Sequence, residues 1–157
     1  MIWCNAWEGG ELSDEILADR VSELLATREG ARGFFVISLA SDSPLMDRLP
    51  EPLVLTFRTA GETVIDLIVR NLAMSTAMTL HHQRQGDEKQ QIGSERVTAR
   101  CLDLLRLLDP NKVKKRLERL LEAIKGEGDD VVFLKRWGYD NEQKLAIVSS
   151  IYKVGEN

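Results

Sequence analysis

One stretch, residues 61–85, constrains the fold of this 157-residue chain more than any other. No proline interrupts it, and its apolar residues cover most of the circumference of a helix. A helix that is apolar on nearly every side is usually buried in a protein core. We therefore predict a central helix over 61–85, built on Val64, Ile65, Leu67, Ile68, Val69, Leu72, Ala73, Met74, Ala77, Met78 and Leu80.

Amphipathic segments on both sides of this stretch predict a mainly α protein. Their apolar residues recur at spacings of three and four, and capping residues and helix breakers mark their ends. The expected segments are 13–28, 52–84, 94–108, 110–126 and 140–154. The second of them forms either one long helix or two helices divided near Gly61. The chain should therefore fold as a bundle of four to six helices around the central one.

Three segments leave an α+β alternative open. Residues 34–40 are a run of large apolar and β-branched residues, which favours a buried strand. Residues 131–137 suit either a short helix or a strand that would pair with 34–40. Residues 145–154 follow Asp140 and Gln143, which resemble a capping box, so a final helix is favoured there.

The length of the chain suits a single domain over residues 1–157, because this many residues bury a core without metal or disulfide support. Residues 1–11 are expected to form an N-terminal arm that carries Trp3 and Trp7. Such an arm covers either its own core or a neighbouring subunit. We favour the neighbouring subunit, because Gly9 and Gly10 form a hinge before the first helix.

Composition predicts a soluble, cytoplasmic protein without a membrane span. The N-terminus lacks the basic region of a secretory signal, and Cys4 and Cys101 are too few for a disulfide framework. Asp66, Arg70 and Asn71 interrupt the central helix, which argues against a membrane helix. The formal net charge of −4 argues weakly against non-specific nucleic-acid binding.

A polar stripe on the central helix is the first candidate site. Asn71, Ser75, Thr79 and His82 recur at steps of four, four and three residues, next to Arg70. The favoured interpretation is structural, because Ser and Thr often bond back to the carbonyl one turn earlier and Asn bridges helices. The alternative is a small enzyme or ligand-binding protein that uses this stripe.

The sequence contains no recognisable metal-binding or cofactor-binding motif. The two histidines, His81 and His82, are adjacent and would point about 100° apart on a helix. Zinc, nucleotide-binding and nucleophile-elbow motifs are all absent. We therefore expect no metal and no cofactor, and we favour a non-catalytic protein.

Two sets of charged residues are further candidate sites. Glu62, Asp66 and Arg70 follow at four-residue steps, the favourable order for ion pairs along a helix. Residues 112–119 carry five positive charges that scatter round the polar face of a helix, which favours a solvated surface. A nucleic-acid-binding regulator that uses 112–119 is the alternative, but nucleic acid remains an unlikely partner.

The aromatic residues favour a role in protein interaction. Trp3, Trp7, Trp137 and Tyr139 lie near the arm or near glycines, and such residues are enriched at the anchors of protein interfaces. We therefore predict a protein-interaction or scaffold protein that forms a homo-oligomer through these residues.

Overall fold

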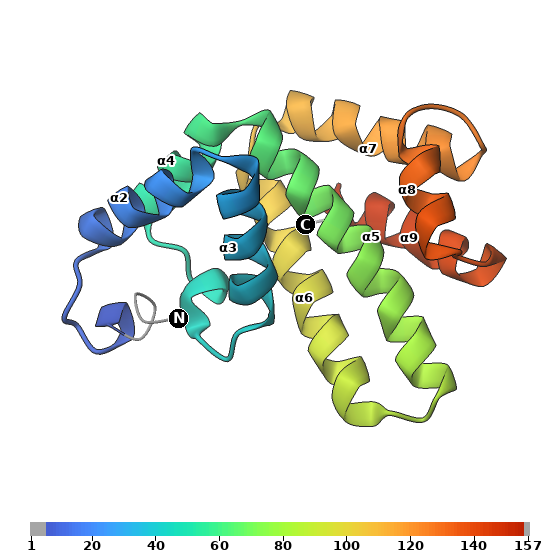
Figure 1. Cartoon of the computed structure of the whole chain (residues 1–157), viewed down its shortest axis with the longest axis horizontal. Helices are drawn as coiled ribbons and strands as arrows, with labels where there is room; N and C mark the ends of the chain where they lie inside the picture. The colour runs from blue at the N-terminus through green and yellow to red at the C-terminus, as the bar shows by residue number, and fades with distance from the viewer. Residues whose placement is uncertain (1–5, 156–157) are drawn as a thin grey trace.

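The computed structural model describes residues 6–155, which are almost entirely helical (Figure 1). Within this range it contains eight complete α-helices, one short 3-10 helix and no strand. The elements are α2 (Asp14–Leu25), α3 (Arg28–Ala40), η1 (Pro44–Asp47), α4 (Glu51–Ala60), α5 (Glu62–Arg84), α6 (Glu88–Leu107), α7 (Pro110–Ile124), α8 (Asp130–Trp137) and α9 (Asn141–Val154). The mainly α prediction is confirmed, with more helices than the expected four to six.

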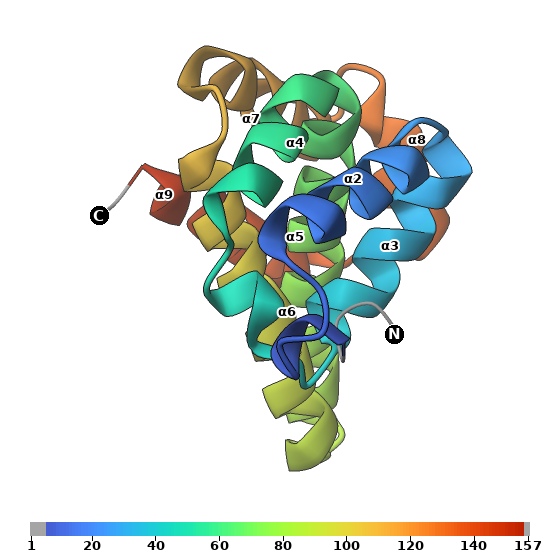
Figure 2. The ribbon, with the colours of Figure 1, turned by 90° about the vertical axis from the view of Figure 1, so that its left-hand side faces the viewer.

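Helix α5 occupies the centre of the fold, as predicted. Ile68, Leu72 and Ala73 have no exposed surface, and α3, α6, α7 and α9 all pack against the helix. Helices α5 and α6 form a hairpin whose tip extends beyond the other helices (Figure 1 and Figure 2). Within the described range α5 is the one helix long and apolar enough to cross a membrane, but 56% of that window is buried by the protein itself, as is typical of a core helix.

The strand prediction for residues 34–40 is wrong, because these residues lie in α3. Thr27 caps the helix by accepting a hydrogen bond from the Gly30 amide, so the preceding helix ends at Leu25 rather than near 28. Phe34 and Phe35 are buried, whereas the next two residues of the run, Val36 and Ile37, are half exposed. A continuous apolar run favours a buried strand, but here the run divides between the two faces of one helix.

The aromatic residues of α3 join the N-terminal helices to the core. The rings of Phe34 and Phe35 lie 5.0 Å apart, and Phe35 lies 5.4 Å from Phe57 of α4. Helices α2 and α4 lie side by side over this cluster (Figure 2). The cluster gives the first half of the chain a shared core of aromatic contacts.

The segment from 52 to 84 forms two helices rather than one, and Gly61 divides them. Gly61 has φ of +63°, a conformation that side chains with a Cβ rarely adopt. The following helix pair departs from prediction, because α6 begins at Glu88 with Asp87 as its cap instead of at Ser94. The polar stretch 83–96 therefore forms the solvated ends of two antiparallel helices.

The described residues of the C-terminal third form helices joined by short turns and contain no strand, so the second half of the expected strand pair is also wrong. Asp109 and Pro110 start α7 as predicted, and Asp140 and Gln143 form the capping box of α9. Residues 131–137 lie in α8, which Gly138 ends in the left-handed conformation. Leu134 is buried while Val132 is exposed, so this short apolar run also divides between two helix faces.

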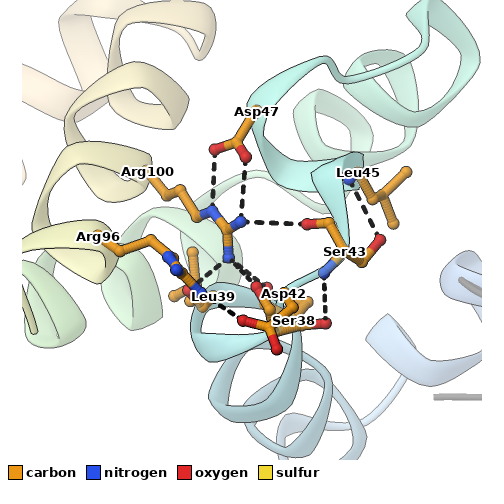
Figure 3. A network of polar contacts seen from close by, with 9 residues as sticks. Ser38, Leu39, Asp42, Ser43, Leu45, Asp47, Arg96 and Arg100 are labelled. Carbon is orange, nitrogen blue, oxygen red and sulfur yellow. Dashed lines mark hydrogen bonds and ion pairs between the residues drawn. The ribbon is translucent and has the colours of Figure 1, made fainter. Parts of the chain in front are cut away.

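Arg100 of α6 ties the connection between α3 and α4 to the core (Figure 3). Its guanidinium group donates two hydrogen bonds to the Asp47 carboxylate, at 2.9 and 3.0 Å. It also donates to the carbonyl oxygens of Leu39, Ser41 and Ser43, at 2.9, 2.6 and 3.1 Å. Only 3% of Arg100 is exposed. Its hydrogen bond holds the pKa of Asp47 below its usual value.

Candidate functional site

The side chains of the polar stripe on α5 form hydrogen bonds within α5 or to the neighbouring helix α6. Asn71 donates to the carbonyl of Leu67 at 2.8 Å, and Thr79 donates to the carbonyl of Ser75 at 2.8 Å. The Ser75 hydroxyl lies 2.7 Å from the Thr98 hydroxyl of α6. These side chains satisfy their polar groups within α5 or across the hairpin, as buried polar groups must.

The two ends of the stripe differ from its middle. His82 is partly exposed near the end of α5, with its ring 5.4 Å from that of His81. Arg70 lies beside Asp66, with Nε 3.2 Å from Oδ2 but without hydrogen-bond geometry, and its guanidinium stacks 5.2 Å from the Phe133 ring. The fold therefore draws Arg70 into a charge cluster, on the other side of the helix from α6.

This charge cluster joins four helices, α3, α5, α7 and α8, whose residues are distant in the sequence. Arg116 of α7 donates from Nε to Asp66 at 2.9 Å and donates twice to Asp130 of α8, at 2.5 and 3.0 Å. Arg28 of α3 donates to the other Asp66 oxygen at 2.6 Å. Arg116 and Asp130 are buried, so their pairing fixes α8 against α7 and α5.

Asp66 stays ionised at the centre of the cluster. Burial by itself would raise its pKa, but the hydrogen bond from Arg28 and the charge of Arg116 outweigh burial and hold the pKa below its usual value. One carboxylate thus serves three arginines. The expected ion pair between Asp66 and Arg70 forms, within a larger network that spacing along one helix does not reveal.

A cationic cleft of about 530 Å³ opens beside this cluster, between the start of α5 and α7. The charged side chains that line it are Arg28, Glu62, Asp66, Lys112, Lys115, Arg116 and Arg119. Four of the five basic residues in 112–119 therefore converge on one side of α7, and only Lys114 lies on the other. The expectation that these positive charges scatter round the helix is wrong, because positions separated by three, four and seven residues share a helix face. That spacing was readable in the sequence, whereas the contribution of Arg28 was not.

An apolar groove of about 520 Å³ lies on the opposite side of α7, between α6, α7 and α9. Its apolar lining is Leu105, Leu108, Pro110, Val113, Leu117, Leu121, Ile151, Tyr152 and Val154. Lys114, Glu118 and Arg106 provide its charged lining. The sequence places most of these residues on amphipathic stripes, but only the fold leaves a gap between the stripes.

Helix α9, which borders the groove, also exposes apolar side chains on its outer side. Leu145 is 69% exposed and Tyr152 is 64% exposed, and their separation of seven residues puts them on one side of the helix. The buried residues of α9, such as Ile147 and Ile151, lie on a different side. Helix α9 is therefore apolar on its inner face and also on part of its outer face.

The candidate interface aromatics occupy different environments. Trp137 is exposed at the end of α8, whereas Tyr139 is partly buried, which raises the pKa of its hydroxyl to about 12. Trp7 packs on the core of its own chain and donates from its indole nitrogen to Asp14 at 2.6 Å. Trp3 lies outside the described residues.

The remaining reactive groups do not form a constellation. Cys101 is buried, and burial raises the pKa of its thiol well above the usual value. Over residues 6–155 no three His, Cys, Asp or Glu side chains lie in an arrangement that could hold a metal ion.

The fold and these surfaces define an all-α protein with an apolar groove and a cationic cleft on opposite sides of one amphipathic helix. Residues 1–154 match the family described as Uncharacterised conserved protein UCP020893, and the chain belongs to this family. A search of curated proteins and a search of solved structures found no match to the chain.

Proposed function

We propose that this protein works as a non-catalytic interaction protein, and that the apolar groove binds a second copy of the same chain. The observation that carries the proposal is a pair of exposed apolar side chains on α9: Tyr152 at the edge of the groove, and Leu145 two turns earlier on the same side of the helix. Contiguous apolar surface on a protein is a frequent mark of an interaction site.

The energetics favour an anchor role for these two side chains. Complete burial of a large apolar side chain contributes about 1.5–3 kcal/mol, and tyrosine is enriched among the residues that dominate interface energies. The groove offers the partly exposed Leu121 and Val154 as a matching surface, above lining residues that are mostly buried. Leu145 and Tyr152 would therefore supply a substantial share of the free energy of association.

The charges around the groove favour a second copy as the occupant. Lys114 and Glu118 both line the groove, one turn apart on α7. In a twofold dimer the same patch occurs on both subunits, so Lys114 of each copy can face Glu118 of the other. A surface that carries both signs in this way is complementary to itself.

The test is the mass of the full-length chain by sedimentation equilibrium over a range of concentrations. We expect an oligomer that dissociates when Leu145→Glu and Tyr152→Glu are combined. A matched control combines Leu55→Glu and Ile92→Glu, which change two similarly exposed residues on α4 and α6 and should leave the mass unchanged.

Two results would overturn the proposal. One is a full-length chain that is monomeric at about 100 micromolar, which corresponds to an association too weak for a stable dimer. The other is an oligomer that survives the α9 changes. Deleting residues 1–9 shows whether the oligomer forms through the groove or through the N-terminal arm, because only an arm-mediated oligomer would dissociate on deletion.

We also propose a soluble, cytoplasmic location. The acidic net charge of −4 and the free, buried thiol of Cys101 support it, since reducing compartments leave thiols unpaired. Fractionation of cells that express the full-length chain tests the proposal, and recovery in the membrane pellet would contradict it.

A further inference from the structure

We infer that the cationic cleft between α5 and α7 is a binding site for the dianionic phosphate group of a phosphate monoester. This site is separate from the apolar groove, because the two surfaces lie on opposite sides of α7. Binding here does not depend on self-association.

The charges that line the cleft do not balance. Five cationic side chains face two carboxylates, which leaves an excess of three positive charges. Among the flanking partners, Arg70 beside Asp66 adds one positive charge, and Asp130 and Asp129, which pair with Arg116 and Arg119, remove two, so an excess of two remains. A phosphate monoester carries about 1.5 to 2 negative charges at neutral pH, so one such group would neutralise the cleft.

The excess charge resides on side chains that have no strong partner in the described part of the protein. Lys112 and Lys115 form no ion pair there, and Arg119 reaches only the exposed Asp129, at 3.8 Å. Arg28 and Arg116, in contrast, are held by Asp66. The cleft thus combines two arginines that pair with Asp66 and three cations without a strong partner. Lysine and arginine are the residues that bind phosphate oxygens most strongly.

The start of α5 adds to the positive potential of the cleft. Helix α5 has no side-chain cap at Gly61, and the first-turn residues Glu62 and Thr63 border the cleft. The Lys112 ammonium lies close to this turn, since a Cβ added at Gly61 would be 3.7 Å from it. The positive end of the α5 dipole adds to the attraction of the lysines for an anion, and Glu62 in the first turn offsets part of it.

The size of the cleft favours one phosphate group over a nucleic-acid backbone. Lys112 and Arg119 are seven residues apart, which spans about 10 Å of helix. A nucleic acid needs an extended basic track to meet successive phosphates. Glu62 borders this cleft, and Glu118 and Glu122 lie elsewhere on the exposed surface of α7, so the positive surface is short and concave.

Isothermal titration calorimetry of the full-length chain with inorganic phosphate tests the inference. We expect saturable binding that chloride or acetate at the same ionic strength does not reproduce. Combining Lys112→Gln with Lys115→Gln should weaken binding by about tenfold or more, because two charge-assisted contacts are lost. The matched control combines Lys89→Gln with Lys125→Gln, which removes two exposed charges outside the cleft and should keep the affinity within about twofold.

A second arm identifies the source of the phosphate monoester. Vesicles of phosphatidylcholine with phosphatidic acid present the same group on a lipid, and binding to them but not to plain phosphatidylcholine assigns the site to a headgroup. Binding of free phosphate without vesicle binding assigns it to a soluble phosphoester. The inference is overturned if phosphate fails to bind at about 10 mM. It is also overturned if the control pair weakens binding as much as the cleft pair, or if only an RNA oligonucleotide without a terminal phosphate binds.

Discussion

Loss of the Arg100 side chain should destabilise the protein far more than loss of its ion-pair partner. Arg100 is buried and bonds to four backbone carbonyls as well as to Asp47, whereas the Asp47 side chain is 51% exposed (Figure 3). The carbonyls of Ser38 and Leu39 belong to the last turn of α3, and those of Ser41 and Ser43 belong to the turn that follows it. Arg100 therefore acts mainly as a cap for this turn.

The magnitudes follow from burial. Hydrogen bonds to a charged group contribute about 1.5–3 kcal/mol each, but water can reach part of the turn, so the losses do not add in full. We expect Arg100→Ala to lower the free energy of unfolding by about 3–5 kcal/mol. Asp47→Ala should cost no more than about 1 kcal/mol, because a half-exposed ion pair is screened by solvent.

Urea denaturation followed by far-UV circular dichroism measures both changes. Arg96→Ala is the matched control, because Arg96 lies one turn earlier on α6 and pairs with the fully solvated Asp42 at 2.7 Å. That control should change stability by less than about 0.5 kcal/mol. The reasoning fails if Asp47→Ala costs as much as Arg100→Ala, since the ion pair would then dominate. It also fails if Arg100→Ala costs less than about 1 kcal/mol.

Three further changes test the core and the charge cluster. Leu72→Ala should cost about 2–5 kcal/mol in urea denaturation, because Leu72 has no exposed surface, and a loss below about 1 kcal/mol would mean that α5 is peripheral. Asp66→Asn should cost about 2–4 kcal/mol at pH 7, because Arg116 loses a buried partner. The pKa of Asp66 in the folded protein lies below its ordinary value of 3.8, so the stability that this carboxylate contributes is present above pH 3.8 and is lost as the pH falls through the folded pKa. The free energy of unfolding of Asp66→Asn should therefore fall less steeply on acidification than that of the wild type. Parallel curves of stability against pH would contradict the prediction. Cys101 should react with a thiol reagent in a Cys4→Ser background only as fast as the protein unfolds, and immediate labelling of the native chain would show that the thiol is accessible.

Local signals in the sequence located the central helix and several helix ends correctly. The apolar circumference of 61–85 predicted burial, and α5 is buried. The capping box of Asp140 and Gln143 also agrees with the structure, and of the two alternatives for 52–84 the structure has the one divided at Gly61. These features depend on contacts within one or two turns, so the residues that decide them are neighbours in the chain.

Short apolar runs were ambiguous because composition and length do not separate a buried strand from a helix with a half-exposed face. Residues 34–40 and 131–137 are both helices, and in each the packing of neighbouring helices selects which apolar residues are covered. The start of α6 was also misplaced, because Asp87 and Ser94 are both competent caps and the sequence does not say which one is used.

The surfaces proposed to bind ligands depend on tertiary structure. Charge along α7 was visible in the sequence, and helical spacing alone places Lys112, Lys115 and Arg119 on one side. Only the packing of α7 against α5 turns that side into a cleft, because Asp66 and Arg28 reach it from positions about 50 and 90 residues away along the chain. Side-chain chemistry along one helix is encoded locally, whereas its pairing with distant charges is settled when the helices pack.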